Sequence, residues 1–155
     1  MTETLQARMT SIGVVAPDAV KALIAFARSA QNAGVPETTA NLIRLRASQI
    51  NGCSVCTEMH SRDIKKAGES DDRVFAVAAW RDSPYFTGAE RAALALTEAV
   101  TRLADRPDPV PDEVWDEAAR HYDERALAAL LLEIAAINAF NRLSVPAHQP
   151  SGQQW

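Results

Sequence analysis

The chain has 155 residues, of which 47% are hydrophobic and 23% charged, a composition typical of one folded domain with a substantial core. Its formal net charge is −4, and no run of lysine and arginine provides the basic patch that phosphate backbones require. We therefore expect a single domain over residues 1–155 and no nucleic acid partner.

The first residues, Met1 to Leu5, lack the basic start and the apolar core of a signal peptide. No uninterrupted apolar stretch is long enough to cross a bilayer. We therefore expect a cytoplasmic protein with no membrane partner. Reductants in the cytoplasm keep cysteines as reduced thiols, so a close cysteine pair there is more often catalytic or metal-binding than a structural disulfide.

Helical signals dominate the first half of the chain. A first helix is predicted after Pro17-Asp18, and it should end near residues 32–34, where glycine suits a left-handed cap. Pro36 suits the first turn of a second helix, which should run to the turn signal Asn51-Gly52. A third helix is predicted from about Cys53 to residues 65–68, where two lysines and a glycine favour a helix end.

The second half continues in the same way, and no convincing alternating strand or hairpin signal interrupts it. The fold class predicted is therefore all-α. One further helix is expected over residues 70–80, and the next begins at the capping-box spacing of residues 87–90. After a proline-rich connection, two more helices are expected over residues 112–121 and 123–143.

The helix predicted over 123–143 is the most apolar of the chain, and this favours a central or interface position and an oligomer. Glu133 lies within it and should be paired, either with Arg142 or with an arginine of the second helix. The polar tail over 146–155 is expected to be loose or to pack on a neighbouring subunit.

Both cysteines lie in one short motif, Cys53-Ser54-Val55-Cys56, and His60 follows four residues later. Residues three or four apart share a helical face, so Cys53, Cys56 and His60 can form a row. Thiolates are favoured at helix N-termini, beside a protonated histidine and in Cys-X-X-Cys pairs. The motif therefore predicts a redox-active dithiol. His60 would take the proton of Cys56 or, as imidazolium, hold its thiolate.

Two assignments of the cysteines are open from position alone. Cys53 lies nearer the helix start, where the dipole acts most strongly, whereas only Cys56 has a histidine four residues away. We favour Cys56 as the thiol that attacks a peroxide and Cys53 as the thiol that resolves the sulfenic acid. Other interpretations are two cysteines in a helical core, or a zinc site that would need His121 and His148, which are remote. We expect neither a metal nor another cofactor.

Residues 42–60, LIRLRASQINGCSVCTEMH, strongly resemble the signature of the alkylhydroperoxidase AhpD-like group within the carboxymuconolactone decarboxylase family. Residues 80–91 and 138–143 are similar to later blocks of that family, so the resemblance covers most of the chain. It implies an AhpD-like orthogonal bundle of about six to eight helices and assembly into trimers or hexamers. It also implies a thiol-dependent peroxidase that reduces alkyl hydroperoxides.

Carried over by position, the resemblance makes Cys56 the peroxidatic thiol, Cys53 the resolving thiol and His60 part of the proton relay. Asn41, Ser48 and Asn51 are further candidates for lining the site or taking part in the relay. The partners implied are a hydroperoxide substrate and a dithiol reductant, either a lipoylated or a thioredoxin-like protein. The decarboxylase activity that names the family is not expected, because that branch lacks the cysteine pair.

Two positions depart from the best-known AhpD branch. Asn41 stands where that branch has a glutamate base, and Val55 stands where it has a second histidine. Asparagine can form hydrogen bonds but cannot accept the proton. Either His60 is the base alone, or the chain performs another dithiol reaction. The alternative function is a non-enzymatic redox-sensing or structural oligomeric protein that uses the same dithiol as a switch.

Overall fold

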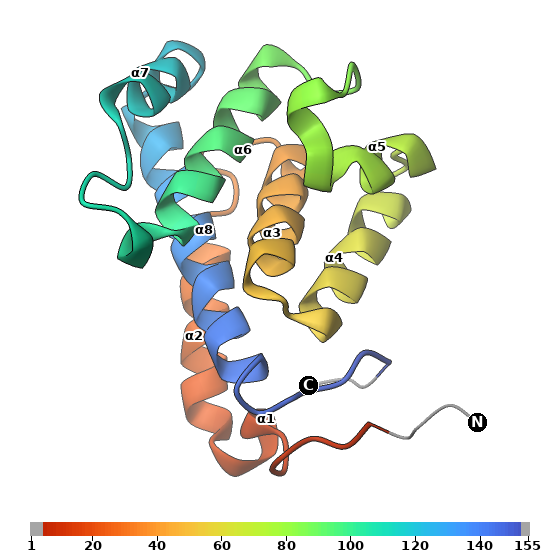
Figure 1. Cartoon of the computed structure of the whole chain (residues 1–155). Coiled ribbons are helices and arrows are strands. Elements are labelled where there is room, and N and C mark those ends of the chain that lie inside the picture. Colours follow the sequence, from red (N-terminus) through yellow and green to blue (C-terminus); the bar gives the residue numbers. More distant parts are fainter. Residues whose placement is uncertain (1–4, 153–155) are drawn as a thin grey trace.

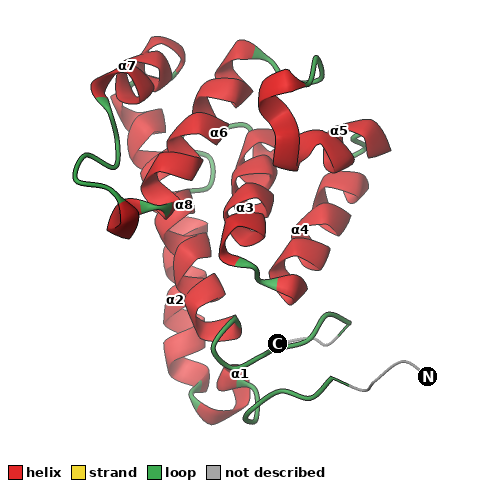
Figure 2. Ribbon diagram, in the orientation of Figure 1, coloured by secondary structure: helices red, strands yellow, loops and turns green. Residues whose placement is uncertain are grey.

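The computed structural model describes residues 5–152. Residues 1–4, for which no signal peptide was expected, and residues 153–155 of the predicted tail lie outside the described part. The described residues form helices and loops without a strand (Figure 2). The predicted all-α fold is therefore confirmed. The elements are α1 (Ile12–Val15), α2 (Pro17–Ser29), α3 (Glu37–Asn51), α4 (Ser54–Lys66), α5 (Asp71–Ala76), the 3-10 helix η1 (Val77–Asp82), α6 (Gly88–Thr101), the 3-10 helix η2 (Leu103–Asp105), α7 (Asp112–His121) and α8 (Glu124–Ser144).

Helix α3 lies at the centre of the bundle and packs against α4, α6 and α8 (Figure 1). Its Ile43 belongs to an apolar cluster with α6, α7 and α8, whereas Leu42 and Leu45 belong to a second cluster with α4, η1 and α6. Full burial of one such side chain contributes about 1.5–3 kcal/mol. The central helix therefore holds the two halves of the core together.

Helix boundaries differ from the predictions at the N-terminal end. The single turn α1 was not predicted; the Oγ of Ser11 caps it by accepting from the backbone N–H of Gly13. Helix α2 ends at Ser29, earlier than expected, and Gly34 then adopts a φ of 101°. A Cβ at Gly34 would lie 3.2 Å from the Cβ of Ala126, so both the turn and the close approach favour glycine here. Pro36 is the N-cap of α3 rather than a residue of its first turn.

The predicted helix over 70–80 is divided in two. It starts as expected, with the Oγ of Ser70 capping the backbone N–H of Arg73, but α5 ends at Ala76 and η1 continues with a kink at Ala79. The predicted capping box is confirmed. The Oγ1 of Thr87 accepts from the N–H of Glu90 (3.2 Å), and the Glu90 carboxylate accepts from the N–H of Thr87 (2.8 Å).

Helix α8 is long and apolar enough to cross a membrane by length and composition alone, but 56% of the tested window is buried inside the protein. It is the core helix of a helical domain, flanked by α2, α3 and α6 (Figure 1). Its apolar residues Leu127, Leu130, Ile134 and Ile137 are buried within this chain. They therefore do not by themselves require a second subunit.

The described part of the tail, residues 146–152, packs on its own chain. The N–H of Arg8 donates to the carbonyl of Ala147 (2.8 Å), the hydroxyl of Ser54 to the carbonyl of Gln149 (3.4 Å) and the N–H of Gly152 to the Glu58 carboxylate (2.7 Å). The expectation of a loose tail is therefore wrong for these residues, and packing on a neighbouring subunit stays a prediction. Leu5 and Gln6 near one end of the described chain, and residues 148–150 near the other, line one cavity together with Gly52 and Ser54 of the turn that joins α3 to α4.

Candidate active site

The turn between α3 and α4 places the cysteine pair. Gly52 adopts a φ of 69°, which favours glycine, and its N–H donates to the carbonyl of Gln49 (3.3 Å). The N–H of Cys53 donates to the carbonyl of Ser48 (3.0 Å). These bonds close the end of α3, and Cys53 then becomes the N-cap of α4.

Cys53 and Cys56 are joined by a disulfide, with their Cα atoms 5.3 Å apart. The Sγ of Cys53 also accepts from the backbone N–H of Cys56 at 3.3 Å, as an N-cap side chain does. Both residues are buried. The predicted helix start at the cysteines is therefore confirmed, and both sulfurs lie where the helix dipole favours negative charge.

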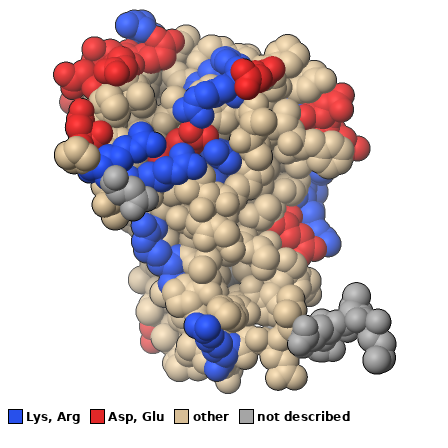
Figure 3. Space-filling model, in the orientation of Figure 1, with Lys and Arg blue, Asp and Glu red and all other residues tan. Residues whose placement is uncertain are grey.

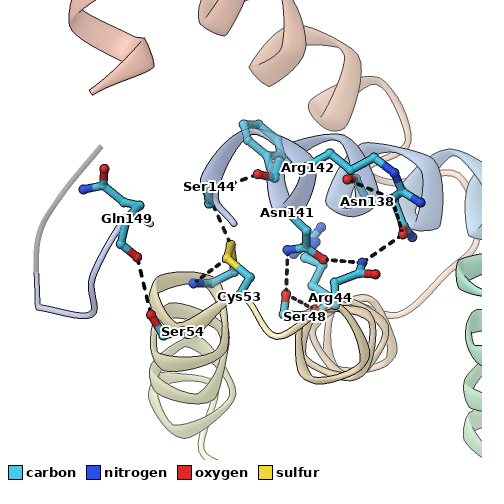
Figure 4. Close-up of a disulfide and its surroundings, with 12 residues drawn as sticks. Arg44, Ser48, Cys53, Ser54, Asn138, Asn141, Arg142, Ser144 and Gln149 are labelled. Atoms are coloured by element: carbon cyan, nitrogen blue, oxygen red, sulfur yellow. Dashed lines mark hydrogen bonds between the residues drawn. A yellow bond between two sulfur atoms is a disulfide. The ribbon is translucent and has the colours of Figure 1, made fainter. Parts of the chain in front are cut away.

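A buried polar network behind the turn ties α3 to α8 (Figure 4). The amide of Asn51 donates to Asn138 (3.0 Å) and Asn141 (2.9 Å), and the amide of Asn141 donates to the hydroxyl of Ser48 (3.1 Å). Ser48 in turn donates to the carbonyl of Arg44 (2.7 Å). The structure thus places Ser48 and Asn51 where they hold the turn that carries Cys53.

Ser144, near the end of α8, is a neighbour of the disulfide that the sequence analysis missed. Its Oγ lies 3.8 Å from the Sγ of Cys56 and donates to the carbonyl of Phe140 at 3.1 Å. Ser144 follows directly after the block 138–143 that was used for the resemblance. Its distance of 88 residues from Cys56 leaves no local signal for the contact.

A cavity of about 300 Å³, here called the Cys56 cavity, lies between α2, α3, α4 and α8. Cys56 and His60 lie in its wall, so the structure brings these two predicted site residues together. Cys53 and Asn41 are not among the residues that line it. The apolar walls come mainly from α2 and α8 and include Val20, Ile24, Ala27, Ala136, Ile137 and Phe140.

His60 is buried, and its Nδ1 lies 3.5 Å from the carboxylate of Asp63 without forming a hydrogen bond. Burial lowers the pKa of His60 to about 4, and the positive charge of Arg44 acts in the same direction, outweighing the attraction of Asp63. At neutral pH the imidazole is therefore uncharged. In this oxidised state it is suited to accept a proton rather than to hold a thiolate as a cation.

Arg44 and Glu133 form a two-point ion pair in the wall of the Cys56 cavity. The Nε and Nη2 of Arg44 each lie 2.9 Å from a carboxylate oxygen of Glu133, and Nη1 contacts Glu37 and Asn41, each at 2.9 Å. Of the two partners predicted for Glu133, the arginine of the second helix is confirmed. Arg142 instead donates to the side-chain oxygen of Asn138 (2.7 Å). Asn41 thus anchors Arg44, while Glu133 is a carboxylate that lines the cavity.

Neither of the other histidines lines the Cys56 cavity, but His148 shares the wall of a second cavity with Cys53. The Nε2 of His121, at the end of α7, lies 3.2 Å from the carboxylate of Glu117, and His148 follows α8. Within residues 5–152, no group of three or more His, Cys, Asp or Glu side chains converges as a metal site would require.

Solved structures of two proteins are similar to the fold of this chain. A protein of unknown function from Agrobacterium tumefaciens, described as a candidate antioxidant defence protein AhpD, has a structure that matches with a TM-score of 0.89 at 31% identity, covering 96% of this chain and 100% of its own. The debrominase Bmp8 in its apo form matches with a TM-score of 0.77 at 25% identity, covering 87% of this chain and 72% of its own.

Sequence comparison gives the same grouping. The uncharacterized protein YdfG of Bacillus subtilis is 35% identical over 131 residues, which are 84% of this chain and 88% of its own length. Residues 17–99 match the model of the carboxymuconolactone decarboxylase family. The chain therefore belongs to the carboxymuconolactone decarboxylase family and has the AhpD-like fold.

Proposed function

We propose that this protein is a thiol-dependent peroxidase that reduces organic hydroperoxides through a dithiol and disulfide cycle. One observation carries the proposal. Cys56, half of a disulfide at a helix start, lies with the uncharged His60 in the wall of a largely apolar cavity of about 300 Å³. Apolar walls with a few polar groups at one end are typical of sites for small organic molecules.

The first step oxidises Cys56. His60 accepts the thiol proton, and the Cys56 thiolate attacks the terminal oxygen of the hydroperoxide. A sulfur–oxygen bond forms, the oxygen–oxygen bond breaks, and the alkoxide leaves as the alcohol after receiving the proton held by His60. Cys56 is then a sulfenic acid, and the peroxide has been reduced by two electrons.

The second step closes the disulfide. The Cys53 thiolate attacks the Sγ of Cys56, the sulfur–sulfur bond forms, and hydroxide leaves as water after protonation. The two residues occupy one helix turn at 5.3 Å between Cα atoms, within the range that a disulfide needs. A dithiol reductant, lipoylated or thioredoxin-like, then returns two electrons and two protons.

The base in this scheme is His60, because Asn41 cannot accept a proton. Its lowered pKa keeps the imidazole unprotonated and available at neutral pH, and it also makes the imidazole a weaker base than one whose pKa lies near 7. The nearby carboxylate of Glu133 is held by Arg44. We propose that Glu133 sets the charge of the cavity rather than carrying the proton.

We propose that the protein acts in the cytoplasm as a homo-oligomer, a trimer or a hexamer. Helices α1 and α2 leave large apolar side chains exposed, among them Val14, Val15 and Phe26. On the face seen in Figure 3, the end of the molecule that carries these helices shows few charged residues. Self-association would remove this apolar surface from water.

Single-cysteine variants test the function and the two roles. We expect Cys56→Ser to abolish steady-state consumption of cumene hydroperoxide in the presence of dihydrolipoamide. Cys53→Ser should be oxidised once, to a sulfenic acid that dimedone traps and mass spectrometry detects, and then stop. Ser54→Ala, next to Cys53, is the matched control and should retain turnover.

Other results would replace the proposal. If Cys53→Ser alone prevents the first oxidation, the two roles are reversed. If the wild-type protein forms one disulfide and consumes no further peroxide with reductant present, the redox-sensor alternative replaces the peroxidase.

Reductive dehalogenation is a second candidate function. It is favoured by the apolar cavity that leads to Cys56 and by the likeness to the debrominase Bmp8. The dithiol would supply two electrons and two protons and become a disulfide. One proton would take the place of bromine on the ring, and the carbon–bromine bond would break to release bromide ion together with the second proton. Release of bromide from a brominated pyrrole by the reduced protein, without release by Cys56→Ser, would establish this reaction.

A further inference from the structure

The Cys56 cavity has polar residues at two different depths. Cys56 and His60 are buried, with exposed fractions of 1% and 7%. Arg28 and Gln31 also line the cavity, but both residues are exposed, so they lie where the cavity meets solvent. Most of the remaining wall is apolar. The cavity therefore has a reactive inner end, an apolar wall and a polar mouth, which is the part lined by Arg28 and Gln31.

Helix α2 presents Arg28 to this cavity together with apolar side chains. Val20, Ile24, Ala27 and Arg28 line it, and their spacing of four, three and one residues places them on one face of the helix. A cation in the last turn of a helix is favoured by the dipole, which accounts for the position of Arg28 along α2. The dipole does not select a face. Arg28 nevertheless lies on the face that borders the cavity.

The positive charge of Arg28 is not balanced by a carboxylate of the cavity. The side chain of Arg28 has no hydrogen bond or ion pair with any residue of the described range 5–152. Glu133 is the only acid among the described residues that line the cavity, and Arg44 holds it through two hydrogen bonds of 2.9 Å. His60 is uncharged at neutral pH. The lining therefore carries one excess positive charge, at the mouth.

We propose, resting on the proposed function, that the substrate is the hydroperoxide of a small carboxylic acid and that Arg28 binds its carboxylate. A guanidinium presents its N–H groups in a planar fork that binds a carboxylate through two parallel hydrogen bonds. The apolar part of the acid lies against Ile24, Ala27 and Ile137, and the hydroperoxide group lies at Cys56. The product is the corresponding hydroxy acid.

The size of the cavity limits the acid. A volume of about 300 Å³ is at the lower end of the range found for sites of small organic ligands. It suits a short or monocyclic acid better than a long-chain fatty acid. Because Arg28 binds the end of the substrate that is remote from the peroxide, it is a specificity residue and does not contact the reacting atoms.

The surroundings of the mouth are compatible with an anion. Lys21 lines a neighbouring surface hollow that shares Ile24 and Arg28 with the Cys56 cavity, so a second cation lies on the same side of α2. The formal net charge of −4 repels anions at longer range, so selection depends on the local contact with Arg28. Phe26, assigned above to self-association, is two residues from Arg28 and on another face of α2.

A matched pair of peroxides tests the charge requirement. One is cumene hydroperoxide with a carboxylate on the ring, para to the peroxide-bearing carbon, and the other is its methyl ester. The second-order rate constant for oxidation of the reduced protein is measured with each, by alkylation and mass spectrometry. We expect the acid to react at least about tenfold faster than the ester in the wild type, since hydrogen bonds between charged groups are the stronger ones.

Variants of α2 assign that preference to one residue. Arg28→Gln should lower the ratio of the acid and ester rate constants to about one or less. Arg28→Lys should restore part of the ratio, because it keeps the charge and loses the planar fork. Lys21→Gln removes the same charge from the same helix outside the Cys56 cavity and should keep the wild-type ratio. Circular dichroism establishes that each variant is folded. A ratio near one in the wild type, or an unchanged ratio in Arg28→Gln, would overturn the proposal.

A second measurement contains no peroxide. Reduced protein is alkylated with iodoacetamide in the presence of 4-isopropylbenzoate or of its neutral amide, and modification of Cys56 is followed by mass spectrometry. We expect the acid to protect Cys56, and the amide to need at least about tenfold higher concentration. Arg28→Gln should remove the advantage of the acid. No protection by the acid, or equal protection by the amide, would overturn the assignment.

The two measurements separate this inference from the proposed function. If 4-isopropylbenzoate protects Cys56 through Arg28 and neither peroxide oxidises the protein, the peroxidase is wrong and the anionic ligand stands. If both peroxides oxidise the protein at equal rates, the peroxidase stands and the carboxylate specificity is wrong.

Discussion

Helix α3 presents two arginines, Arg44 and Arg46, to two buried glutamates on opposite sides of the bundle. Arg44 holds Glu133 of α8, and Arg46 donates from Nε to Glu98 of α6 at 2.7 Å. The two carboxylates are similarly buried, with side-chain exposures of 4% and 7%. The two regions differ in what surrounds the pair.

Glu98 is enclosed by hydrogen-bond donors. Besides Arg46, it accepts from the indole N–H of Trp80 (2.9 Å) and from Arg81 (2.6 Å). Burial by itself would raise the pKa of Glu98, but the hydrogen bonds from Arg81, Trp80 and Arg46 outweigh it and lower the pKa below its ordinary value. This carboxylate joins α3, η1 and α6 and acts as a structural centre.

Glu133 has one arginine partner and lines the cavity that contains Cys56 and His60. Its charge therefore acts on groups that change protonation or oxidation state. The comparison shows one buried ion pair surrounded by hydrogen-bond donors and another that borders a cavity, and we propose that only the second adjusts the reactivity of the site.

The largest expected effect is on stability at Glu98. Glu98→Gln leaves the buried Arg46 without its anionic partner, so the free energy of unfolding should fall by about 3–5 kcal/mol. Urea unfolding measures the change. Arg102→Gln is the control, because Arg102 lies 3.6 Å from Glu98 at a more exposed position and should cost no more than about 1 kcal/mol. A loss at Glu98 as small as that of the control would contradict the structural role.

The next effect is a dependence of the free energy of unfolding on pH, which originates at His60 in the wall of the Cys56 cavity. The pKa of His60 is about 4 in the folded protein, against 6.5 as its ordinary value, so between these values the unfolded chain binds a proton that the folded chain does not. Stability is retained above pH 6.5 and falls as the pH is lowered toward 4, by about 1.4 kcal/mol per pH unit.

Urea unfolding between pH 7 and pH 4 tests this dependence, and His60→Asn should flatten it. The Glu98 region is distinguishable, because its lowered pKa places its loss of stability below the ordinary value of 4.5. The same slope in His60→Asn as in the wild type would show that other groups cause it.

The third prediction separates the two carboxylates by reactivity. Glu133→Gln should cost about 1–3 kcal/mol, less than Glu98→Gln, because Arg44 retains Glu37 and Asn41. It also removes a negative charge from the Cys56 cavity, so the pKa of the Cys56 thiol should fall. The pH dependence of alkylation of the reduced protein measures that pKa. Glu98→Gln is the control and should leave it unchanged; equal shifts in both variants would remove the distinction.

The smallest effect concerns Ser144. Ser144→Ala removes a hydroxyl 3.8 Å from the Sγ of Cys56. This hydroxyl donates to the Phe140 carbonyl and would have to turn to donate to a thiolate, so its loss should raise the pKa of Cys56 by about one unit or less. The same alkylation assay detects it. Ser48→Ala removes a buried hydroxyl that binds Asn141 instead, and should alter stability without moving the thiol pKa. A larger shift from Ser48→Ala than from Ser144→Ala would contradict the assignment.

Local signals predicted much of this molecule. Ser70, the Thr87–Glu90 box and the Gly52 turn act within one helical turn, and each has the role expected. The same signals failed at the end of α2, which stops at Ser29, and at Ala79, whose backbone dihedral angles leave the helical region. His60 was assigned to the dithiol from its spacing, but its protonation required knowledge of its burial.

The sequence by itself determined that the chain is helical, that a dithiol lies at a helix start and that a histidine follows one turn later, because these features depend on residues within a few positions of one another. Only the tertiary structure decided that Glu133 pairs with Arg44, 89 residues away, and that Ser144 approaches Cys56. It also placed Cys56 and Cys53 in the walls of two separate cavities. These contacts form where α3, α4 and α8 meet, and no periodicity within one helix specifies which residues of another helix it will contact.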